Sequence, residues 1–595
     1  MVLFKAINNF VNPDSNGLPG GIRRRRLFIP PSTNYPLFSY GTGDDQRSFL
    51  SLIESSASVA DDISDTASVS TSRSLPSTLS SLQNNTDQES FHSWLVEEHH
   101  RRYSATVEND DLDEMGRLSR LVSVRSEQKH GEDLFNFRTS YATEAKTLIR
   151  YSFPLIVTFV LEHFFSIVCL LVVGHLGKVE LAAVSLATMT STITFAIFEG
   201  TATALDTLCP QAYGAGNYEL MAVRVQRCIL MSWVIFIPCG LLWWNSAFFL
   251  KYIIASSEVV ELTTKFLRIL IVGAPAYIFF ENGKRFLQAQ GIFEAGTGIL
   301  FVSAPINIVA SWFLVWNETY GIGYIGAPIV AAANFWLMAT LMVLYVRYID
   351  GSDCWFGIFS FKELTSEWYQ LLRLAVPGVL MLESEYLAYE IMTLFASYFG
   401  TTELAAQSTV SSIASVTYMV PFAVGIAAST RIANFIGAQN IDAAKIASRT
   451  ASLASIIAGS INCVLLITFR FQIAKLFTKN PEVIVEVGNL FYPLVGIVQI
   501  FDAIASVSSG ILRAQGAQKI GGIINLVAYY AFGLPLAFIL CESLGLRLSG
   551  LWLGIGSGMV MIGLTETVYI YTSDWEKIIM TAGLYDDISD DETSF

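Results

Sequence analysis

Long apolar runs dominate the chain from Leu148 onward. Each run is about 18–25 residues long, which is enough for a helix to cross roughly 30 Å of hydrocarbon. The runs are continuously apolar rather than alternating, so a membrane β-barrel is excluded. They predict twelve membrane-spanning helices, near residues 148–173, 181–204, 227–249, 266–286, 293–316 and 325–348 in the first half and near 370–398, 404–428, 446–469, 487–511, 519–541 and 550–571 in the second.

The two ends of the chain are polar and interrupt this pattern. Residues 1–135 are rich in Ser, Asp, Asn and Thr and have no sustained helical or strand period, which predicts a disordered, acidic N-terminal region. Residues 573–595 predict a short acidic tail. Between them we expect two membrane lobes, at 145–350 and 366–572.

Composition supports the same class of protein. Hydrophobic residues make up 52% and charged residues 15% of the chain, whereas soluble domains carry roughly 25% charged residues. The net charge of −14 comes mostly from the ends and does not indicate a nucleic-acid partner. The seven cysteines are scattered, which predicts buried small hydrophobes and no metal site. No phosphate-binding loop or Ser/His/Asp arrangement has supporting context, so we expect neither an enzyme nor a cofactor.

The second half repeats the first. Matching positions at an offset of 223 residues are Gly177 and Gly400, Gly214 and Gly437, Pro154 and Pro377, and Glu162 and Glu385. The segment 287–291 returns at 512–516, an offset of 225. Several matches along one diagonal indicate an internal duplication.

The repeat predicts the architecture and a mechanical property. Because each half holds six spans, both halves keep one orientation, related by a pseudo-two-fold axis normal to the membrane. We therefore expect an all-α membrane protein with two six-helix bundles that rock against each other around a central cavity. The paired prolines Pro154 and Pro377 predict a hinge in each half, and Gly214 and Gly437 are predicted structural positions. A duplicated bundle that moves nothing is the alternative.

An even number of spans places both ends of the chain on one side of the membrane. Loops assigned to that side carry the larger number of basic residues: Arg224, Arg227, Lys284, Arg285, Arg347, Lys362, Arg373, Arg431, Lys445, Arg449, Arg513 and Lys519. The positive-inside rule then makes both termini cytoplasmic. The sequon Asn317-Glu318-Thr319 falls on the outer side. The host membrane is predicted to be the plasma membrane or a vacuolar or other endomembrane.

Two acidic residues lie deep in apolar spans of the second half. Glu385 is about fifteen residues into the seventh span, and Asp502 is near the middle of the tenth, which contains no basic neighbour close to it. Low dielectric favours the neutral form of a carboxyl group that has no cationic partner. Glu385 and Asp502 are therefore predicted to take up and release protons in competition with a cation. A structural, hydrogen-bonded carboxyl group is the alternative for each.

The first half has its own acidic residues, but the two halves are chemically unequal. Glu162 is the counterpart of Glu385, and Glu199 lies in the second span. Asp502 corresponds to Tyr277, so the second acid is absent from the first half. We therefore predict proton coupling in the second half and a substrate path lined by Glu162, Glu199 and Tyr277. Tyr386 and Tyr418 are also predicted to line it, since aromatic faces bind organic cations.

Five motifs fall in order along the chain: Gly174-His175-Leu176-Gly177, Ala204 to Ala215, Ala406-Gln407-Ser408, Tyr418 to Pro421 and Leu512 to Gly516. They resemble motifs of the multidrug and toxic compound extrusion (MATE) family. The resemblance covers residues 145–572 and is closest to the eukaryotic branch. The long Ser-rich N-terminus is similar to that of fungal members.

The resemblance implies export of organic solutes in exchange for protons by a twelve-helix protein, which we expect to be a monomer. It implies that Glu385 and Asp502 are the acidic residues of the family's seventh and tenth spans, and that Glu390 is the second acid of the seventh. It adds Gln407 as a cavity residue and Asp206 as part of the motif after the second span.

Two other functions are consistent with this layout. A lipid-linked sugar flippase shares the architecture, but we expect cationic residues along its cavity, and the predicted spans are nearly free of central Arg and Lys. The other alternative function is a membrane scaffold that transports nothing and whose N-terminus binds partners. The preferred prediction is a proton-coupled antiporter whose partners are small organic solutes, protons and the lipid bilayer.

Overall fold

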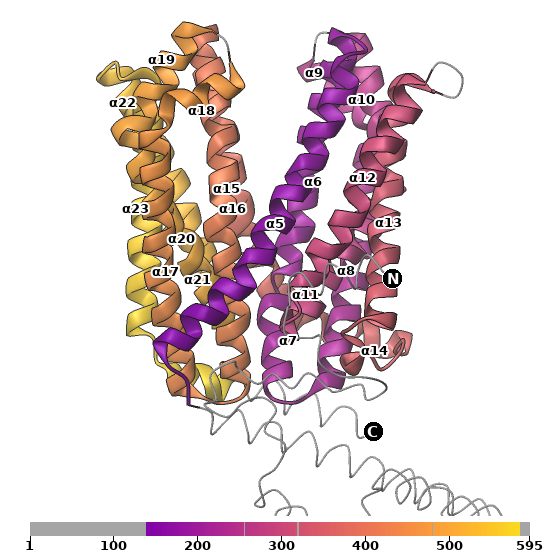
Figure 1. Cartoon of the computed structure of the whole chain (residues 1–595), viewed down its shortest axis with the longest axis vertical. Helices are drawn as coiled ribbons and strands as arrows, with labels where there is room; N and C mark the ends of the chain where they lie inside the picture. The colour runs from indigo at the N-terminus through magenta and orange to yellow at the C-terminus, as the bar shows by residue number, and fades with distance from the viewer. Residues whose placement is uncertain (1–137, 255, 318–320, 479, 583–595) are drawn as a thin grey trace, which may run out of the picture. The chain divides into compact units, whose positions relative to one another are not determined.

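The structure is a computed structural model that describes residues 138–254, 256–317, 321–478 and 480–582. The predicted N-terminal region, 1–135, and the end of the predicted tail, 583–595, lie outside the described residues. All regular elements of the described part are helices, in two bundles (Figure 1).

The first bundle, called the N lobe, holds the helices up to residue 348. They are α5 (Tyr141–Gly174), α6 (Lys178–Ala202), α7 (Leu205–Gly214), α8 (Tyr218–Trp244), α9 (Ser246–Ile253), α10 (Ser257–Leu270), α11 (Ala274–Ala289), α12 (Glu294–Trp316) and α13 (Gly326–Tyr348). Short 3₁₀ turns occur at η3 (Gly323–Ile325) and η4 (Ser352–Cys354).

The second bundle, called the C lobe, follows the connecting helix α14 (Phe361–Thr365). Its helices are α15 (Trp368–Phe399), α16 (Thr401–Gly437), α17 (Ile441–Thr468), α18 (Arg470–Phe477), α19 (Pro481–Leu490), α20 (Gly496–Ala514), α21 (Gln518–Leu526), α22 (Leu534–Ser543) and α23 (Arg547–Thr572). The π-helical segments η5 (Phe491–Val495) and η6 (Val527–Gly533) join α19 to α20 and α21 to α22.

The helices agree with the twelve predicted spans. In the described part, ten are long and apolar enough to cross a membrane alone, and α10 with α11 forms one further span bent by 55°. The twelfth is α15, whose 32 residues are long enough to cross but include Arg373, Glu383, Glu385 and Glu390. Three of these four charged residues are acids, and they include the predicted proton-binding residues Glu385 and Glu390.

The start of the predicted tail is more ordered than expected. Residues 575–582 continue as a helix, whose first turn is capped by the side chain of Asp574 through the backbone N–H groups of Glu576 and Lys577. Trp575 and Ile579 are buried against the C lobe. An apolar residue at every fourth position therefore attaches this segment to the bundle.

The internal repeat corresponds to a repeated turn. After α7, Gly216 adopts a left-handed backbone (φ 81°), and the Asn217 side chain then caps α8 by accepting a hydrogen bond from the Leu220 N–H. After α16, Gln439 adopts the same backbone region (φ 56°), and Asn440 caps α17. A left-handed residue ends one helix and an Asn side chain begins the next, which explains why the segment Gly214 to Asn217 returns as Gly437 to Asn440.

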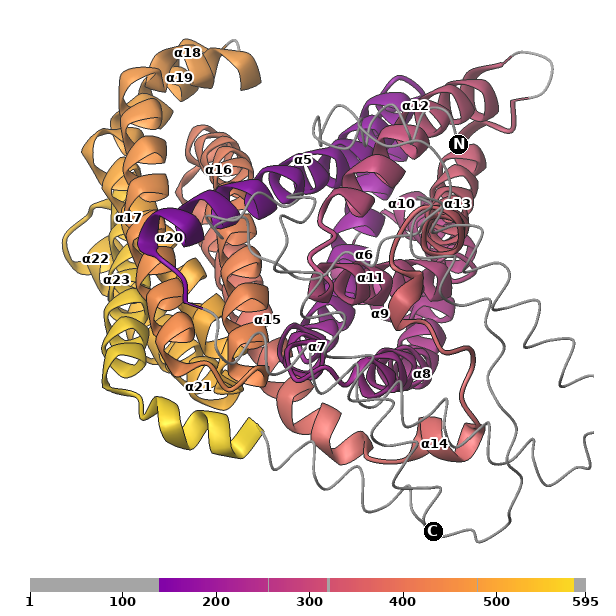
Figure 2. The same ribbon diagram turned by 60° about the horizontal axis from the view of Figure 1, so that its bottom comes forward.

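The first helix of each lobe is anchored on the other lobe. Figures 1 and 2 show α5 running obliquely between the bundles, and near its start Glu144 forms a bidentate ion pair with Arg431 of α16 (both N–O distances 2.7 Å). Glu367, 223 residues after Glu144, pairs just before α15 with Arg227 of α8. The two acids are repeat counterparts, but their arginine partners are not, so each lobe supplies its own cation to the ion pair that joins it to the other lobe.

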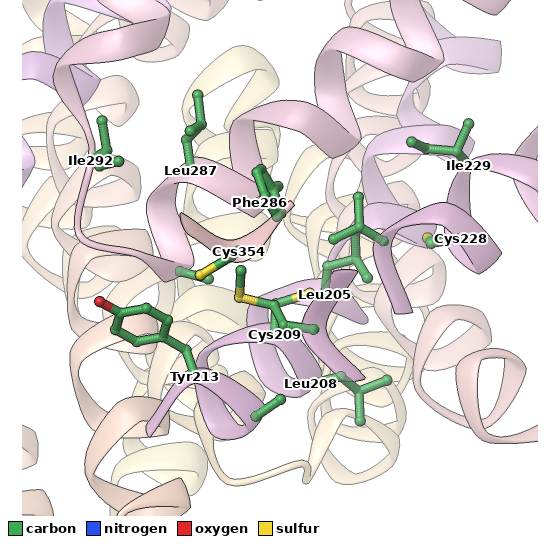
Figure 3. Packing of buried hydrophobic residues seen from close by; sticks show 14 of the residues in the cluster. Leu205, Leu208, Cys209, Tyr213, Cys228, Ile229, Phe286, Leu287, Ile292 and Cys354 are labelled. Atoms are coloured by element: carbon green, nitrogen blue, oxygen red, sulfur yellow. The ribbon is translucent and has the colours of Figure 1, made fainter. Parts of the chain in front are cut away.

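The N-lobe core holds the short helix α7 in place. Leu205, Leu208 and Cys209 of α7 are buried among side chains of α8 and α11, with Cys354 beside them (Figure 3). The opposite face of α7 packs against α16 of the C lobe. A rigid α7 therefore presents its polar residues to the other lobe at a defined position.

The two lobes meet closely where α7 crosses α16. A Cβ atom on Gly214 would overlap the carbonyl oxygen of Asn434, and one on Gly437 would overlap that of Gln211. Gln211 and Asn434 are themselves repeat counterparts, so the crossing is pseudo-symmetric. Only glycine permits this approach of two backbones.

Candidate functional site

A cavity of about 260 Å³ lies in the N lobe. Its wall includes the predicted residues Glu162, Glu199 and Tyr277. The Tyr277 hydroxyl donates a hydrogen bond to Glu199 Oε1 at 2.5 Å. The remaining wall is mostly apolar and aromatic with a few polar groups, which is the lining expected of a small-molecule site.

Three acids of the N lobe, Glu162, Glu281 and Asp206, pair with buried cations. Lys284 Nζ lies 2.7 Å from Glu162 Oε1 and 2.6 Å from Glu281 Oε1. Arg285 contacts the other oxygen of Glu281 at 2.8 Å, and its Nε lies 3.5 Å from Asp206 Oδ1. These residues form a continuous chain of ion pairs from the cavity to α7.

These ion pairs correct the prediction that the basic residues lie in loops. Lys284 and Arg285 lie near the end of α11, inside the predicted span 266–286, and are buried. Four further residues assigned to loops are also buried within helices: Arg224, Arg227, Arg431 and Arg513. The helices therefore carry buried cations that the assignment to loops missed.

The sequence contains a signal for these missed residues. Lys284 and Arg285 follow Glu281 by three and four positions, the spacing that places side chains together on one helix face. An acid with two such cations inside an apolar run predicts a buried ion pair rather than a loop.

A second, small cavity of about 20 Å³ lies in the C lobe and brings Glu385 and Asp502 together. Glu385 lies on α15 and Asp502 on α20, and the Tyr418 hydroxyl of α16 donates to Glu385 Oε2 at 3.4 Å. Asp502 is 4% exposed. Within the described residues, neither Glu385 nor Asp502 forms an ion pair.

Sequence reasoning missed a third acid in this region. Glu566 of α23 has no exposed surface, and its Oε2 accepts a hydrogen bond from the Ser509 hydroxyl at 2.9 Å. Its other oxygen has no hydrogen-bond partner in the described structure. Glu566 is a single acid in an otherwise apolar span, and that isolation could have identified it.

Three other predicted residues lie outside these two cavities. Gln407 is fully buried, accepts a hydrogen bond from the Trp552 indole at 2.9 Å and donates to Ser411 at 3.0 Å. Tyr386 is 42% exposed, and Glu390 is half-buried. Their predicted roles stay predictions, and the contacts of Gln407 are those of a packing residue.

Asp206 connects the two lobes. Besides Arg285 of its own lobe, it faces Arg513 of α20, whose Nε lies 3.6 Å from Asp206 Oδ2. Nearby, the Thr207 hydroxyl donates to the Arg513 carbonyl at 2.5 Å, and the Gln211 amide donates to the Ala514 carbonyl at 3.0 Å. We call this contact of α7 with α16 and with the α20–α21 turn the seam.

The two prolines of the predicted hinges lie inside the first helix of each lobe. Pro154 lies inside α5, where its carbonyl accepts hydrogen bonds from Thr158 at 2.9 Å and Thr297 at 2.7 Å. Pro377 lies inside α15. Two threonine hydroxyls thus occupy the carbonyl at the first of these positions.

A further cavity of about 300 Å³ lies between α17 and the end of α23, lined by Lys445, Arg449 and Trp575 among others. Its lining includes neither Glu385 nor Asp502 and shares no residue with the other two cavities. The described residues also contain no cluster of three or more His, Cys, Asp or Glu side chains that could hold a metal ion.

Comparison with known proteins places this site in a family context. A family model for MatE matches residues 154–313 and 377–539. An uncharacterized transporter of Saccharomyces cerevisiae is 45% identical over 661 residues, which covers 97% of this chain and 94% of the relative. The multidrug and toxin extrusion protein 2 of Mus musculus is 31% identical over 436 residues, or 73% of this chain and 75% of the relative.

Solved structures show the same fold. The crystal structure of the eukaryotic MATE transporter AtDTX14 matches with a TM-score of 0.70 at 29% identity, covering 74% of this chain and 98% of that chain. A Vibrio cholerae MATE transporter, VcmN, in its bent form matches with a TM-score of 0.66 at 19% identity, covering 75% and 100%. The second likeness concerns the fold alone.

Proposed function

This chain belongs to the multidrug and toxic compound extrusion (MATE) family of membrane transporters, and from that premise we propose that it exports organic cations in exchange for protons. The observation that carries the proposal is that one cavity holds both Asp502, which is buried, and Glu385, which is half-buried, without a directly bound cation. Protons and an organic cation compete for the negative charge of these two carboxylates. Competition between the two couples proton entry to export.

The available driving force is sufficient for concentrative transport. One charge that crosses the membrane gains about 2.3 kcal/mol per 100 mV. Each pH unit across the membrane adds roughly 1.4 kcal/mol. Each pH unit supports about a tenfold gradient of solute, since 1.4 kcal/mol corresponds to about a factor of ten. The membrane potential adds to it when more positive charge enters as protons than leaves as solute.

The test uses purified protein in proteoliposomes with an acidic lumen. Uptake of radiolabelled tetraethylammonium, a membrane-impermeant organic cation, should follow the pH gradient, and lumenal pH should rise with it. Glu385→Gln and Asp502→Asn should abolish both signals. Glu261→Gln is the matched control, because Glu261 is exposed and pairs only with Lys265 of its own helix. Normal transport by both cavity variants would disprove the assignment.

We further propose that both termini and the seam face the cytoplasm. The sequon at Asn317 lies at the opposite end of its span from the seam, directly after α12. Expression in a eukaryotic host followed by endoglycosidase treatment should give a mobility shift that Asn317→Gln removes. A glycan on an engineered sequon next to Glu219 instead would reverse the orientation.

The flippase alternative is disfavoured for a different reason from the one that the sequence suggested. The N lobe does contain buried cations, but Lys284 and Arg285 are each paired with carboxylates. Neither is available to neutralise a pyrophosphate group. The buried charges instead suit a cationic solute, which negatively charged cavity walls attract.

A further inference from the structure

Arg513 lies where the two buried charge systems meet. It is in the last turn of α20 and is 4% exposed. On one side it faces Asp206 of the N lobe at 3.6 Å, and on the other it lines the C-lobe cavity with Glu385 and Asp502. Its repeat counterpart is the uncharged Gln288, so the N lobe offers no equivalent cation to the C lobe at this position.

The guanidinium group of Arg513 is incompletely satisfied. Its Nε and Nη2 atoms are buried and have no hydrogen-bond partner among the described residues. Guanidinium carries five N–H donors, and leaving such donors buried without acceptors is costly. The contact with Asp206 is too long for a hydrogen bond. Arg513 is therefore held loosely and has capacity for a second acceptor.

A polar stripe on α20 leads from Arg513 to the cavity acid. Asp502, Ser506, Ser509 and Arg513 are spaced by four, three and four residues, so they share one helix face. All four line the C-lobe cavity. Ser509 is one turn from Arg513 and donates its hydroxyl hydrogen bond to Glu566. Rotation of the Arg513 side chain along this face would bring it toward the C-lobe acids without movement of the backbone.

Charge balance makes the position of Arg513 consequential. The N-lobe chain of ion pairs contains three carboxylates, Glu162, Glu281 and Asp206, but only two cations, Lys284 and Arg285. Arg513 supplies the third positive charge. If it turns toward the C lobe, Asp206 keeps one long contact with Arg285 and the seam loses its only ion pair between the lobes within the described part of α7.

We propose that Arg513 is an exchangeable counter-ion that couples the occupancy of the C-lobe acids to closure of the seam. When bound protons or an organic cation reduce the negative charge of Glu385 and Asp502, Arg513 stays with Asp206 and the seam is closed, as in this structure. When the acids are empty and ionised, they attract Arg513, and the seam opens. An empty carrier whose seam is open to the cytoplasm then cannot close the seam. It therefore does not return to the outward-facing state without a bound proton or solute. This role rests on the proposed function of the two acids.

Other charged and titratable groups surround Arg513 from each packed element. They are Asp206 on α7, Glu281 and Arg285 on α11, Glu385 on α15, Tyr418 on α16, Asp502 on α20, Tyr529 on η6 and Glu566 on α23. Glu566 lies on the C-lobe side and strengthens the attraction toward that lobe whenever it is ionised.

The test measures seam closure directly and needs no substrate. Glu219 and Asp442 are exposed repeat counterparts in the helix turns that follow Gly214 and Gly437. Spin labels on Glu219→Cys and Asp442→Cys, with the partly exposed native cysteines replaced, report the distance across the seam. The protein is placed in lipid nanodiscs, where both faces sense the same pH, and titrated from acid to alkaline.

Wild-type protein should pass from a short to a longer distance as pH rises. Allosteric couplings typically change an equilibrium by 5–150-fold, so we expect the open-to-closed ratio to rise by at least about fivefold. Arg513→Gln should remove this pH response, Arg513→Lys should retain part of it, and Asp206→Asn should favour the longer distance throughout. Lys519→Gln, an exposed charge at the same end of the bundle, is the matched control.

A transport measurement separates this inference from the proposed function. In proteoliposomes with a pH gradient and no solute, Arg513→Gln should dissipate the gradient several-fold faster than wild type. A pH response of the seam in Arg513→Gln that equals that of the wild type overturns the counter-ion role. Complete loss of the response in Arg513→Lys as well would show that the shape of the side chain matters rather than its charge, and this result also overturns the role. If Glu385→Gln and Asp502→Asn still abolish exchange, the proposed function survives that result. Normal exchange by those two variants would overturn the proposed function instead.

Discussion

The two lobes share one fold but use opposite charge chemistry at matching positions. At an offset of 225 residues, Glu281 and Lys284 of α11 correspond to Ser506 and Ser509 of α20, and Tyr277 corresponds to Asp502. The N lobe therefore pairs Glu162 and Glu281 with its own cations, Lys284 and Arg285, whereas Glu385 and Asp502 of the C lobe have no ion pair among the described residues. A neutralised acid stabilises a fixed arrangement, whereas an uncompensated acid must bind a proton or a cation. Duplication supplied two scaffolds, and a few substitutions gave one a structural and the other a titratable interior.

The largest expected effect comes from making the C lobe resemble the N lobe. Ser509→Lys places an ammonium group where Lys284 lies in the other half, within reach of Glu566 and the C-lobe cavity. A permanent internal cation occupies the carboxylates, so proton-driven uptake of tetraethylammonium should be lost. Ser509→Gln, of similar size without the charge, is the control. Equal transport by both variants would break the comparison.

Removing the cation of the N lobe should strongly destabilise the fold. Lys284→Gln leaves Glu162 and Glu281 as buried charges without their ammonium partner, which typically costs about 3–5 kcal/mol. The melting temperature in detergent should fall by several degrees. Lys265→Gln, in an exposed pair with Glu261, should change stability by less than about 1 kcal/mol. A melting temperature of Lys284→Gln equal to that of the control would contradict the structural role.

The seam is where the lobes should behave alike. Gly214→Ala and Gly437→Ala each introduce a Cβ against a backbone carbonyl of the other lobe. Overpacking of this kind costs about 1–3 kcal/mol, and the pseudo-symmetry predicts similar penalties for the two variants. Both should also lengthen the distance between labels at Glu219 and Asp442. A large penalty for only one of them would show that the crossing is not symmetric.

The smallest effect on stability is expected for the C-lobe acid. Asp502→Asn replaces a buried carboxyl that has no ion pair in the described structure, so no partner is left unpaired. The free energy of unfolding should change by less than about 0.5 kcal/mol, as for substitutions that break no contact, or rise slightly. The melting temperature should therefore stay close to that of the wild type, although transport is lost. A destabilisation like that of Lys284→Gln would indicate an unseen structural partner.

Much of the architecture was predictable because it depends on local properties of the sequence. Apolar runs and their length determine the spans, and α10 with α11 shows that even a bent span keeps its hydropathy. The repeat marked Gly214 and Gly437 as structural positions, and the turn that follows each is local, since Asn217 and Asn440 cap their helices through neighbouring backbone groups. Burial of Asp502 likewise followed from its position in an apolar helix.

The pairing of charges was decided by tertiary structure. Lys284 reaches Glu162 across 122 positions of the chain, and Arg513 reaches Asp206 from the other lobe. No local pattern specifies such contacts, because they depend on how packed helices orient their faces. The sequence by itself thus determined twelve helices, two homologous lobes and which acids are buried. Only the packing of the helices decided which of those acids meet a cation, since electrostatic interactions depend on distance in space rather than separation along the chain.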